Sequence, residues 1–217
     1  MEVLLEALEH LTNPNWIMNS GGLYLVLVIL FIETGLFFGF FLPGDPLLFI
    51  SGMIIAGANE AAFPFNTGIL NLFFWGFLFC LSTIIGNMVG YWTGYKFTRF
   101  FKNRKSRFLK PKHLYAAEKF YESKGGGAVL IARFLPVVRT FVPIVGGIVK
   151  MNFKYFMIFN ILGALLWVGL ITTLGYVLGE NPWVERNLEF VIIGLVVLVS
   201  APVLFKMTLG RAKQYTG

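Results

Sequence analysis

Long apolar runs separated by short polar segments dominate this chain. Five runs are long enough to enter or cross a lipid bilayer, and they occupy residues 22–58, 68–95, 126–150, 152–178 and 188–210. A helix needs about 20 apolar residues to cross the hydrocarbon core of a bilayer. The pattern therefore predicts an all-α integral membrane protein, organised as a single membrane domain over residues 1–217.

Two of these runs contain residues that end helices. The interrupting residues are Pro43 and Gly44 in the run 22–58, and Pro136 and Pro143 in the run 126–150. Proline removes a backbone donor and glycine permits a tight turn, so a helix is expected to break at such positions. Each limb is then too short to cross the bilayer by itself, so both runs are predicted to be re-entrant helical hairpins.

The elements recur in the same order along the chain. Residues 1–95 hold an amphipathic segment, the hairpin 22–58 and a span, and form a first repeat. A basic loop with a second amphipathic segment (96–124) precedes the second repeat, 125–179, and a final transmembrane helix follows at 188–210. With the basic loop inside, the two hairpins enter from opposite faces. The sequence predicts an inverted repeat of two opposed re-entrant hairpins plus transmembrane helices, an arrangement that indicates a transport site near the midplane.

Composition supports a membrane protein and excludes other classes. Hydrophobic residues make up 57% of the chain and charged residues 13%, whereas about 25% of an average soluble domain is charged. Cys80 is the only cysteine, which excludes a disulfide-rich secreted scaffold. His10 and His113 are isolated in the sequence, so neither a metal site nor a cofactor is expected.

The net charge of +7 is concentrated in one loop. Ten of the 18 Lys and Arg residues lie between Lys96 and Lys124, and residues 1–95 contain none. Basic residues near membrane spans stay on the cytoplasmic side, so the loop 96–124 and the basic C-terminus are predicted to be cytoplasmic. No nucleic-acid-binding motif accompanies the charge, so no nucleic-acid partner is expected.

Four charged residues lie in the interior of the two broken apolar runs, namely Glu33, Asp45, Arg133 and Arg139. A charge at the bilayer centre costs about 2.5–3.5 kcal/mol even on the most lenient scale. These side chains must therefore face one another, a wet cavity or a polar ligand. Glu33 is expected on the first limb of one hairpin and Asp45 in its turn, while both arginines lie on the other hairpin. We therefore expect the two hairpin tips to meet.

These four residues favour a proton-coupled carrier of an anionic lipid. Arg133 and Arg139 flank the break at Pro136, and guanidinium groups bind phosphate oxygens bidentately. Glu33 and Asp45, in a desolvated site, are suited to take up and release protons. All four residues are predicted to bind substrate, with the two acids coupling transport to protons. No Ser-His-Asp, Cys-His or metal-binding set accompanies them, so an enzyme is not expected.

A set of short motifs has a specific order and spacing between residues 22 and 180. It comprises Glu33, Phe41-Leu42-Pro43-Gly44-Asp45, Gly86-Asn87-Met88-Val89-Gly90-Tyr91 with Gly94, Arg133-Phe134-Leu135-Pro136-Val137-Val138-Arg139-Thr140, Gly146-Gly147, Asn160, Gly163, Trp167, and Gly175-Tyr176 with Gly179. In these motifs the chain resembles the DedA family of bacterial inner-membrane proteins, which is related to the eukaryotic VTT-domain lipid scramblases. Asn87 stands where many relatives are expected to have Asp.

The resemblance implies two opposed re-entrant hairpins and a role in membrane homeostasis. In one branch of the family, it implies return of undecaprenyl phosphate, the carrier lipid of cell-wall synthesis, to the cytoplasmic leaflet. It also implies functional importance for Glu33, Asp45, Arg133 and Arg139. A related polyprenyl phosphate or phospholipid is an equally suitable substrate for these residues.

Other interpretations stay open from the residues. The acids could bind the substrate of a proton-coupled exporter of small cations or drugs, or the protein could be a membrane enzyme acting on lipid phosphates. The four charges could also be a structural salt-bridge cluster in a non-transporting assembly factor. Trp167, in the middle of a span, is interpreted as packing. The glycines at 86, 90 and 94 could pack within one chain or between copies in a homo-oligomer.

Overall fold

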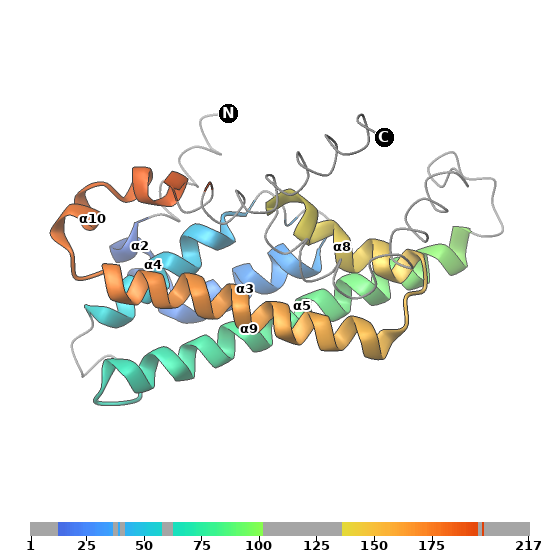
Figure 1. Ribbon diagram of the computed structural model, residues 1–217, viewed down its shortest axis with the longest axis horizontal. Coiled ribbons are helices and arrows are strands. Elements are labelled where there is room, and N and C mark those ends of the chain that lie inside the picture. Colours follow the sequence, from blue (N-terminus) through green and yellow to red (C-terminus); the bar gives the residue numbers. More distant parts are fainter. Residues whose placement is uncertain are drawn as a thin grey trace, which may run out of the picture.

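The computed structural model describes residues 13–36, 39, 42–57, 63–101, 136–194 and 197. All regular elements in this part of the chain are helical: α2 (Pro14–Asn19), α3 (Gly22–Gly35), α4 (Gly44–Ala56), α5 (Gly68–Phe101), α8 (Pro136–Ile148), α9 (Phe153–Leu178) and α10 (Pro182–Arg186) (Figure 1). Residues 188–194 are also helical. The all-α prediction is therefore confirmed for the described residues.

Two helices are long and apolar enough to cross a membrane. They are the Gly68–Phe97 part of α5, with 30 residues, and α9, with 26 residues. They run in opposite directions along the length of the molecule (Figure 1). Their outward faces carry large apolar side chains such as Phe73 and Phe77 on α5 and Val177 on α9, each at least 65% exposed. A surface this apolar suits lipid rather than water.

Helix α5 is longer than the span expected from the sequence. The apolar run ends at residue 95, but the helix continues to Phe101. No proline or glycine lies between residues 95 and 101, so nothing in the sequence ends the helix there. The first residues of the predicted basic loop, Lys96 and Arg99 among them, are therefore helical.

The first broken run forms two short helices, as predicted, but the break is wider than the Pro-Gly motif alone indicates. Helix α3 ends at Gly35, because Leu36 adopts an extended backbone, and α4 begins at Gly44. Asp45 consequently lies in the first turn of α4 rather than in the turn between the helices, which corrects the expectation from the sequence. Helices of 14 and 13 residues are each about 20 Å long, short of the hydrocarbon thickness of about 30 Å.

In the second broken run, one of the two helix breaks expected from the sequence is absent. Helix α8 begins at Pro136, in agreement with the predicted break, but Pro143 lies inside this helix and does not interrupt it. The backbone torsion of proline is compatible with a helix, and the helix loses only the N–H that would bond the carbonyl of Arg139. The other limb predicted for this run lies outside the described residues.

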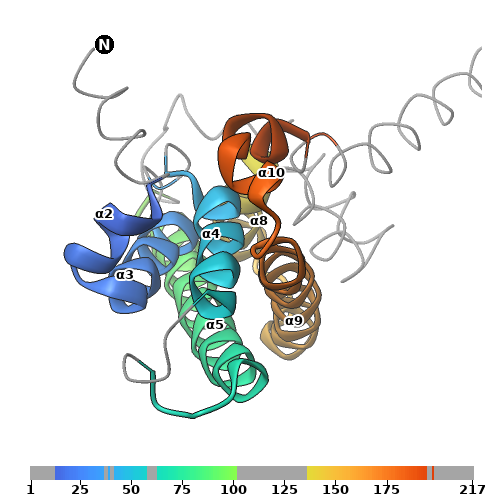
Figure 2. The same cartoon turned by 90° about the vertical axis from the view of Figure 1, so that its left-hand side faces the viewer.

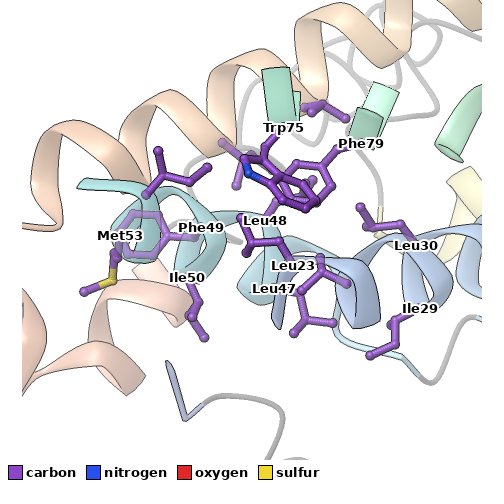
Figure 3. Packing of buried hydrophobic residues seen from close by; sticks show 14 of the residues in the cluster. Leu23, Ile29, Leu30, Leu47, Leu48, Phe49, Ile50, Met53, Trp75 and Phe79 are labelled. Atoms are coloured by element: carbon purple, nitrogen blue, oxygen red, sulfur yellow. The ribbon is translucent and has the colours of Figure 1, made fainter. Parts of the chain in front are cut away.

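Helix α4 occupies the centre of the molecule, between α3 and α9 and against α5 (Figure 2). Its buried Leu48 lies next to Trp75 and Phe79 of α5, Leu47 lies beside Leu23 of α3, and Leu30 of α3 belongs to the same cluster (Figure 3). This apolar core surrounds the short helices on several sides. The first turns of α4, directly after the break, are therefore buried inside the protein, where membrane proteins tolerate helix ends.

Helices α4 and α9 cross at a pair of glycines. A Cβ atom on Gly52 would lie against the carbonyl oxygen of Thr172 and 2.7 Å from the backbone nitrogen of Tyr176. A Cβ atom on Gly175 would lie against the carbonyl oxygen of Phe49. The two backbones therefore approach so closely that neither position accommodates a side chain, as at small-residue contacts in membranes.

Helices α8 and α5 cross in the same way. A Cβ atom on Gly147 would meet the carbonyl oxygen of Tyr91 and the backbone nitrogen of Tyr95, and one on Gly94 would meet the carbonyl oxygen of Ile144. The two crossings share one pattern. The Cβ position of each glycine lies against the carbonyl oxygen of the residue three positions before the opposing glycine. The short helix α4 thus packs on the long helix α9, and the short helix α8 packs on the long helix α5.

Several predicted features lie outside the described residues. They are the amphipathic segments near residues 2–12 and 112–124, the limb before Pro136 with Arg133, and most of the predicted final span 188–210. The division of the chain into two repeats with these boundaries stays a prediction.

Candidate functional site

A buried cluster of three charged side chains lies where three helices meet. The Nη1 of Arg139 pairs with Oδ1 of Asp45, and its Nη2 pairs with Oε1 of Glu33. All three side chains are at most 7% exposed. One guanidinium thus binds both acids, and the expectation that acids and arginines meet is confirmed for Arg139. Arg133 lies outside the described residues.

Helix ends position the three charges. Glu33 lies in the last turn of α3, Asp45 in the first turn of α4, and Arg139 in the first turn of α8. The start of α4 favours the negative charge of Asp45, because the backbone N–H groups there have no partner within the helix. The break between α3 and α4 therefore brings two carboxylates from one segment onto a single cation from another.

Gly44 allows Glu33 to reach this cluster. A Cβ atom at residue 44 would overlap Oε2 of Glu33 and lie 2.6 Å from its carboxyl carbon. The motif Pro43-Gly44-Asp45 therefore does more than break the helix. Its glycine leaves the space that the carboxylate of the preceding helix occupies.

Trp167 of α9 is a fourth member of the cluster. Its indole Nε1 donates a hydrogen bond of 2.7 Å to Oδ1 of Asp45, and Cζ of Arg139 lies 4.5 Å from the centroid of its ring. The interpretation of Trp167 as packing alone is therefore incomplete. A signal was present in the sequence, because a buried indole N–H requires an acceptor and few polar groups are available within apolar spans.

The hydrogen bonding of the cluster is incomplete within the described part of the chain. Oε2 of Glu33 and Nε of Arg139 are buried and have no hydrogen-bond partner there. With all groups ionised, two carboxylates and one guanidinium carry a net charge of −1. Uptake of one proton would make the cluster neutral, so protonation and charge balance are linked at this site.

A second polar contact joins the two long helices. Nδ2 of Asn87 donates a hydrogen bond of 2.8 Å to Oδ1 of Asn160, whose own Nδ2 lies 3.3 Å from the carbonyl oxygen of Ile84. Both asparagines are buried. Gly86, beside Asn87, packs on Thr34, beside Glu33. This contact therefore adjoins the element that holds the charged cluster.

Metal binding finds no support in the described residues. No group of three or more His, Cys, Asp or Glu side chains able to hold a metal ion is found among them. The cluster itself contains only two carboxylates and is already occupied by a guanidinium. With one carboxylate in excess of the guanidinium, the cluster suits the uptake and release of a proton.

Apolar outer faces, two helices of spanning length and a buried charged cluster together define a helical membrane protein. The VTT domain matches residues 42–177, more than half of the chain. Protein DedA of Escherichia coli (strain K12) is 38% identical over 179 residues, covering 82% of this chain and 78% of its own. The chain therefore belongs to the DedA family of VTT-domain membrane proteins, which confirms the resemblance in its motifs.

Two further relatives support the same conclusion. Inner membrane protein YqjA of Escherichia coli (strain K12) is 40% identical over 186 residues, covering 82% of this chain and 79% of its own. An uncharacterized membrane protein of Mycobacterium tuberculosis is 31% identical over 211 residues, covering 94% of this chain and 89% of its own. No solved structure matches the chain significantly.

Proposed function

We propose that this protein moves an anionic phosphate lipid between the leaflets of the bacterial inner membrane, coupled to protons. Undecaprenyl phosphate, or a related polyprenyl phosphate or phospholipid, is the proposed substrate. The observation that supports this proposal is the buried guanidinium of Arg139, bound by Glu33 and Asp45 at the ends of broken helices. Ionisable side chains this deep in an apolar protein are rare and typically mark substrate or proton pathways.

The contacts of Arg139 suggest how lipid and protons are coupled. Both Nη groups are occupied by carboxylates, and these are the donors that a bidentate phosphate would use. The headgroup and the ionised acids therefore compete for one guanidinium. When an acid takes up a proton, its hold on Arg139 weakens and the Nη group that it occupied becomes available. Protons and lipid are then expected to favour each other's binding, as linkage requires.

Charge balance supports the same coupling. A phosphate monoester carries a charge of about −1.5 to −2 near neutral pH. Adding it to a cluster with a net charge of −1 would be strongly unfavourable in a low-dielectric site. Arg133 is proposed as a second phosphate ligand, and protons on the acids would offset the remaining charge.

The proposed architecture is an inverted repeat with two opposed re-entrant hairpins. The matching crossings of α4 on α9 and of α8 on α5 support it, because a pseudo-two-fold arrangement exchanges such contacts between halves. The opposite directions of α5 and α9 also agree with it. The loop 96–124 and the C-terminus are proposed to be cytoplasmic because they are basic.

The decisive experiment measures binding and leaflet exchange of undecaprenyl phosphate by the purified protein in liposomes. We expect saturable binding that strengthens as the pH falls below neutral, and loss of both activities in Arg139→Lys, because an ammonium cannot replace the planar fork. Arg186→Lys makes the same change at an exposed arginine of α10 and should behave as the wild type. Equal activity of Arg139→Lys and wild type would contradict the proposal.

A proton-coupled exporter of small cations is the second candidate. The excess of carboxylates over guanidinium in the described cluster favours it, because two acids can hold a cation after releasing their protons. Under this alternative Arg139→Lys keeps its activity and the protein shows no saturable binding of undecaprenyl phosphate. A lipid-phosphate enzyme would instead release inorganic phosphate from the lipid in the same liposomes.

A further inference from the structure

The two acids of the cluster have different hydrogen-bond environments. Oδ1 of Asp45 accepts from two donors, Nη1 of Arg139 and Nε1 of Trp167. Glu33 accepts from Nη2 of Arg139 through Oε1, while its buried Oε2 has no well-formed hydrogen bond among the described residues and is approached only by the backbone N–H of Gly44. Because Asp45 and Glu33 differ in their hydrogen bonds, we do not expect the two carboxylates to have the same role.

We propose that Glu33 carries the exchanged proton, that Asp45 stays ionised as the permanent partner of Arg139, and that Trp167 is the positioning residue that creates this difference. The inference deepens the proposed function and rests on it for its physiological meaning. The hydrogen-bond asymmetry does not depend on which solute is transported.

Elementary electrostatics supports the assignment of Glu33. A buried carboxylate oxygen without a well-formed hydrogen bond makes the ionised form unfavourable, and a proton on that oxygen removes the uncompensated charge. The charged groups that act on Glu33 are Arg139 of α8 and Asp45 of α4. Within the described chain, the helices packed around it contribute no other charged side chain at this depth. Glu33 therefore gains or loses its proton according to what Arg139 binds.

Trp167 of α9 contacts both Asp45 and Arg139. Its N–H donates to the oxygen that Arg139 also binds, and its ring lies over the guanidinium. A hydrogen bond to the ionised form of an acid favours that form, and the π face of an indole favours the cation. Both contacts stabilise the ionised Asp45–Arg139 pair, and neither reaches Glu33. When lipid binds, Asp45 can therefore hold Arg139 in place while Glu33 releases it.

The test observes the protons directly and does not depend on transport. Infrared difference spectra of the purified protein in lipid nanodiscs, recorded as the pH is lowered, report the C=O stretch of a buried protonated carboxyl group. We expect one such band in the wild type, its loss in Glu33→Gln, and its retention in Asp45→Asn. A band lost in Asp45→Asn and retained in Glu33→Gln would overturn the assignment, as would a wild type with no band.

Trp167→Phe tests the positioning role, because it keeps an aromatic ring and removes the donor. We expect a second carboxyl band, from Asp45, in this variant, and the second band should vanish in Trp167→Phe/Asp45→Asn. Trp183→Phe makes the same change at an exposed tryptophan and should give the wild-type spectrum. A single band in Trp167→Phe would overturn the role of Trp167.

Transport in the same samples separates this inference from the proposed function. Binding of undecaprenyl phosphate by Glu33→Gln should lose the pH dependence that the wild type shows, because residue 33 then has no proton to exchange. If no variant or wild type moves the lipid while the bands behave as expected, the proposed function fails and the division between the acids stands. If the lipid moves but Glu33→Gln keeps the wild-type pH profile, the inference fails and the proposed function stands.

Discussion

The side-chain amides of Asn87 and Asn160 form a hydrogen bond of 2.8 Å that joins the two long helices of the protein. Asn160 is completely buried and Asn87 is 5% exposed. An amide in an apolar region requires partners, because unsatisfied polar groups are costly away from water. The contact therefore sets both the distance and the register between α5 and α9 beside the charged cluster.

Replacing these asparagines should reveal a measurable coupling. We expect Asn87→Leu, Asn160→Leu and the double variant to give a coupling energy between about 0.6 kcal/mol, the average for hydrogen bonds between membrane helices, and about 1.7 kcal/mol, the largest value found. Reversible unfolding in bicelles measures it. Thr93→Val is the control, because this exposed hydroxyl bonds only the carbonyl of Val89 in its own helix. Strictly additive effects of the two asparagines would argue against this contact.

Gly169 and Gly175 both lie in α9, but replacing each of them with alanine should change the stability of the protein by different amounts. Gly175→Ala inserts a methyl group against the carbonyl of Phe49, whereas a Cβ atom at Gly169 meets nothing within 4 Å. We expect Gly175→Ala to lower the free energy of unfolding by about 1–3 kcal/mol, as overpacking does. Gly169→Ala should be neutral or stabilise by up to about 1 kcal/mol through helix propensity. Thermal unfolding in detergent ranks the two variants, and equal stability would refute the close approach.

The second crossing provides a parallel test. Gly94→Ala places a methyl group against the carbonyl of Ile144, while Gly76 on the same helix has open space. We expect Gly94→Ala and Gly76→Ala to differ in free energy of unfolding. This difference should match the one between Gly175→Ala and Gly169→Ala within about 1 kcal/mol. The same unfolding assay applies. Widely unequal differences would count against the proposed two-fold relation between the halves.

Gly44→Ala should disrupt the cluster without changing any charge. The added methyl group overlaps Oε2 of Glu33, so the carboxylate must move away from Arg139. We expect a loss of about 1–3 kcal/mol in stability, and a much smaller loss when Gly44→Ala is made in Glu33→Ala, where nothing overlaps. Gly57→Ala, whose Cβ atom would lie 3.7 Å from the nearest atom, is the control. Equal losses in both backgrounds would show that the overlap is not the cause.

Much of the fold and the charged residues of the cluster could be predicted from the sequence, because each depends on local chemistry. Apolar length predicted the spans of α5 and α9, Pro43 and Pro136 predicted breaks, and the exclusion of charges from lipid singled out Glu33, Asp45 and Arg139. These rules need only the identity of a residue and its immediate neighbours.

Features that depend on the partner helix could not be predicted in the same way. The hydrogen bond from Trp167 to Asp45 joins residues 122 positions apart, and periodicity shows that a residue is buried without showing what it contacts. Pro143 was expected to break a helix, because a local rule cannot include the packing of α8 on α5 that holds the helix together. The early end of α3 at Gly35 likewise accompanies its packing on Gly86.

Removing the arginine alone should destabilise the protein far more than removing all three charges. Arg139→Met removes the guanidinium that both buried carboxylates bind, and we expect stability to fall by about 3–5 kcal/mol. The loss should shrink as the pH falls, because protonation neutralises the acids. In Glu33→Leu/Asp45→Leu/Arg139→Met none of these three charges remains, so stability should return to the wild-type value or above it. Reversible unfolding across pH measures both variants.

The same triple variant separates a transport site from a structural fastener. If the cluster serves only to hold α3, α4 and α8 together, well-packed apolar side chains should replace it and activity should persist. If Arg139 binds the phosphate and Glu33 the proton, the stable triple variant should exchange no undecaprenyl phosphate in liposomes. Because its stability is measured independently, loss of exchange cannot be attributed to unfolding. Exchange at the wild-type rate would show that the three charges are structural partners and that the lipid binds elsewhere.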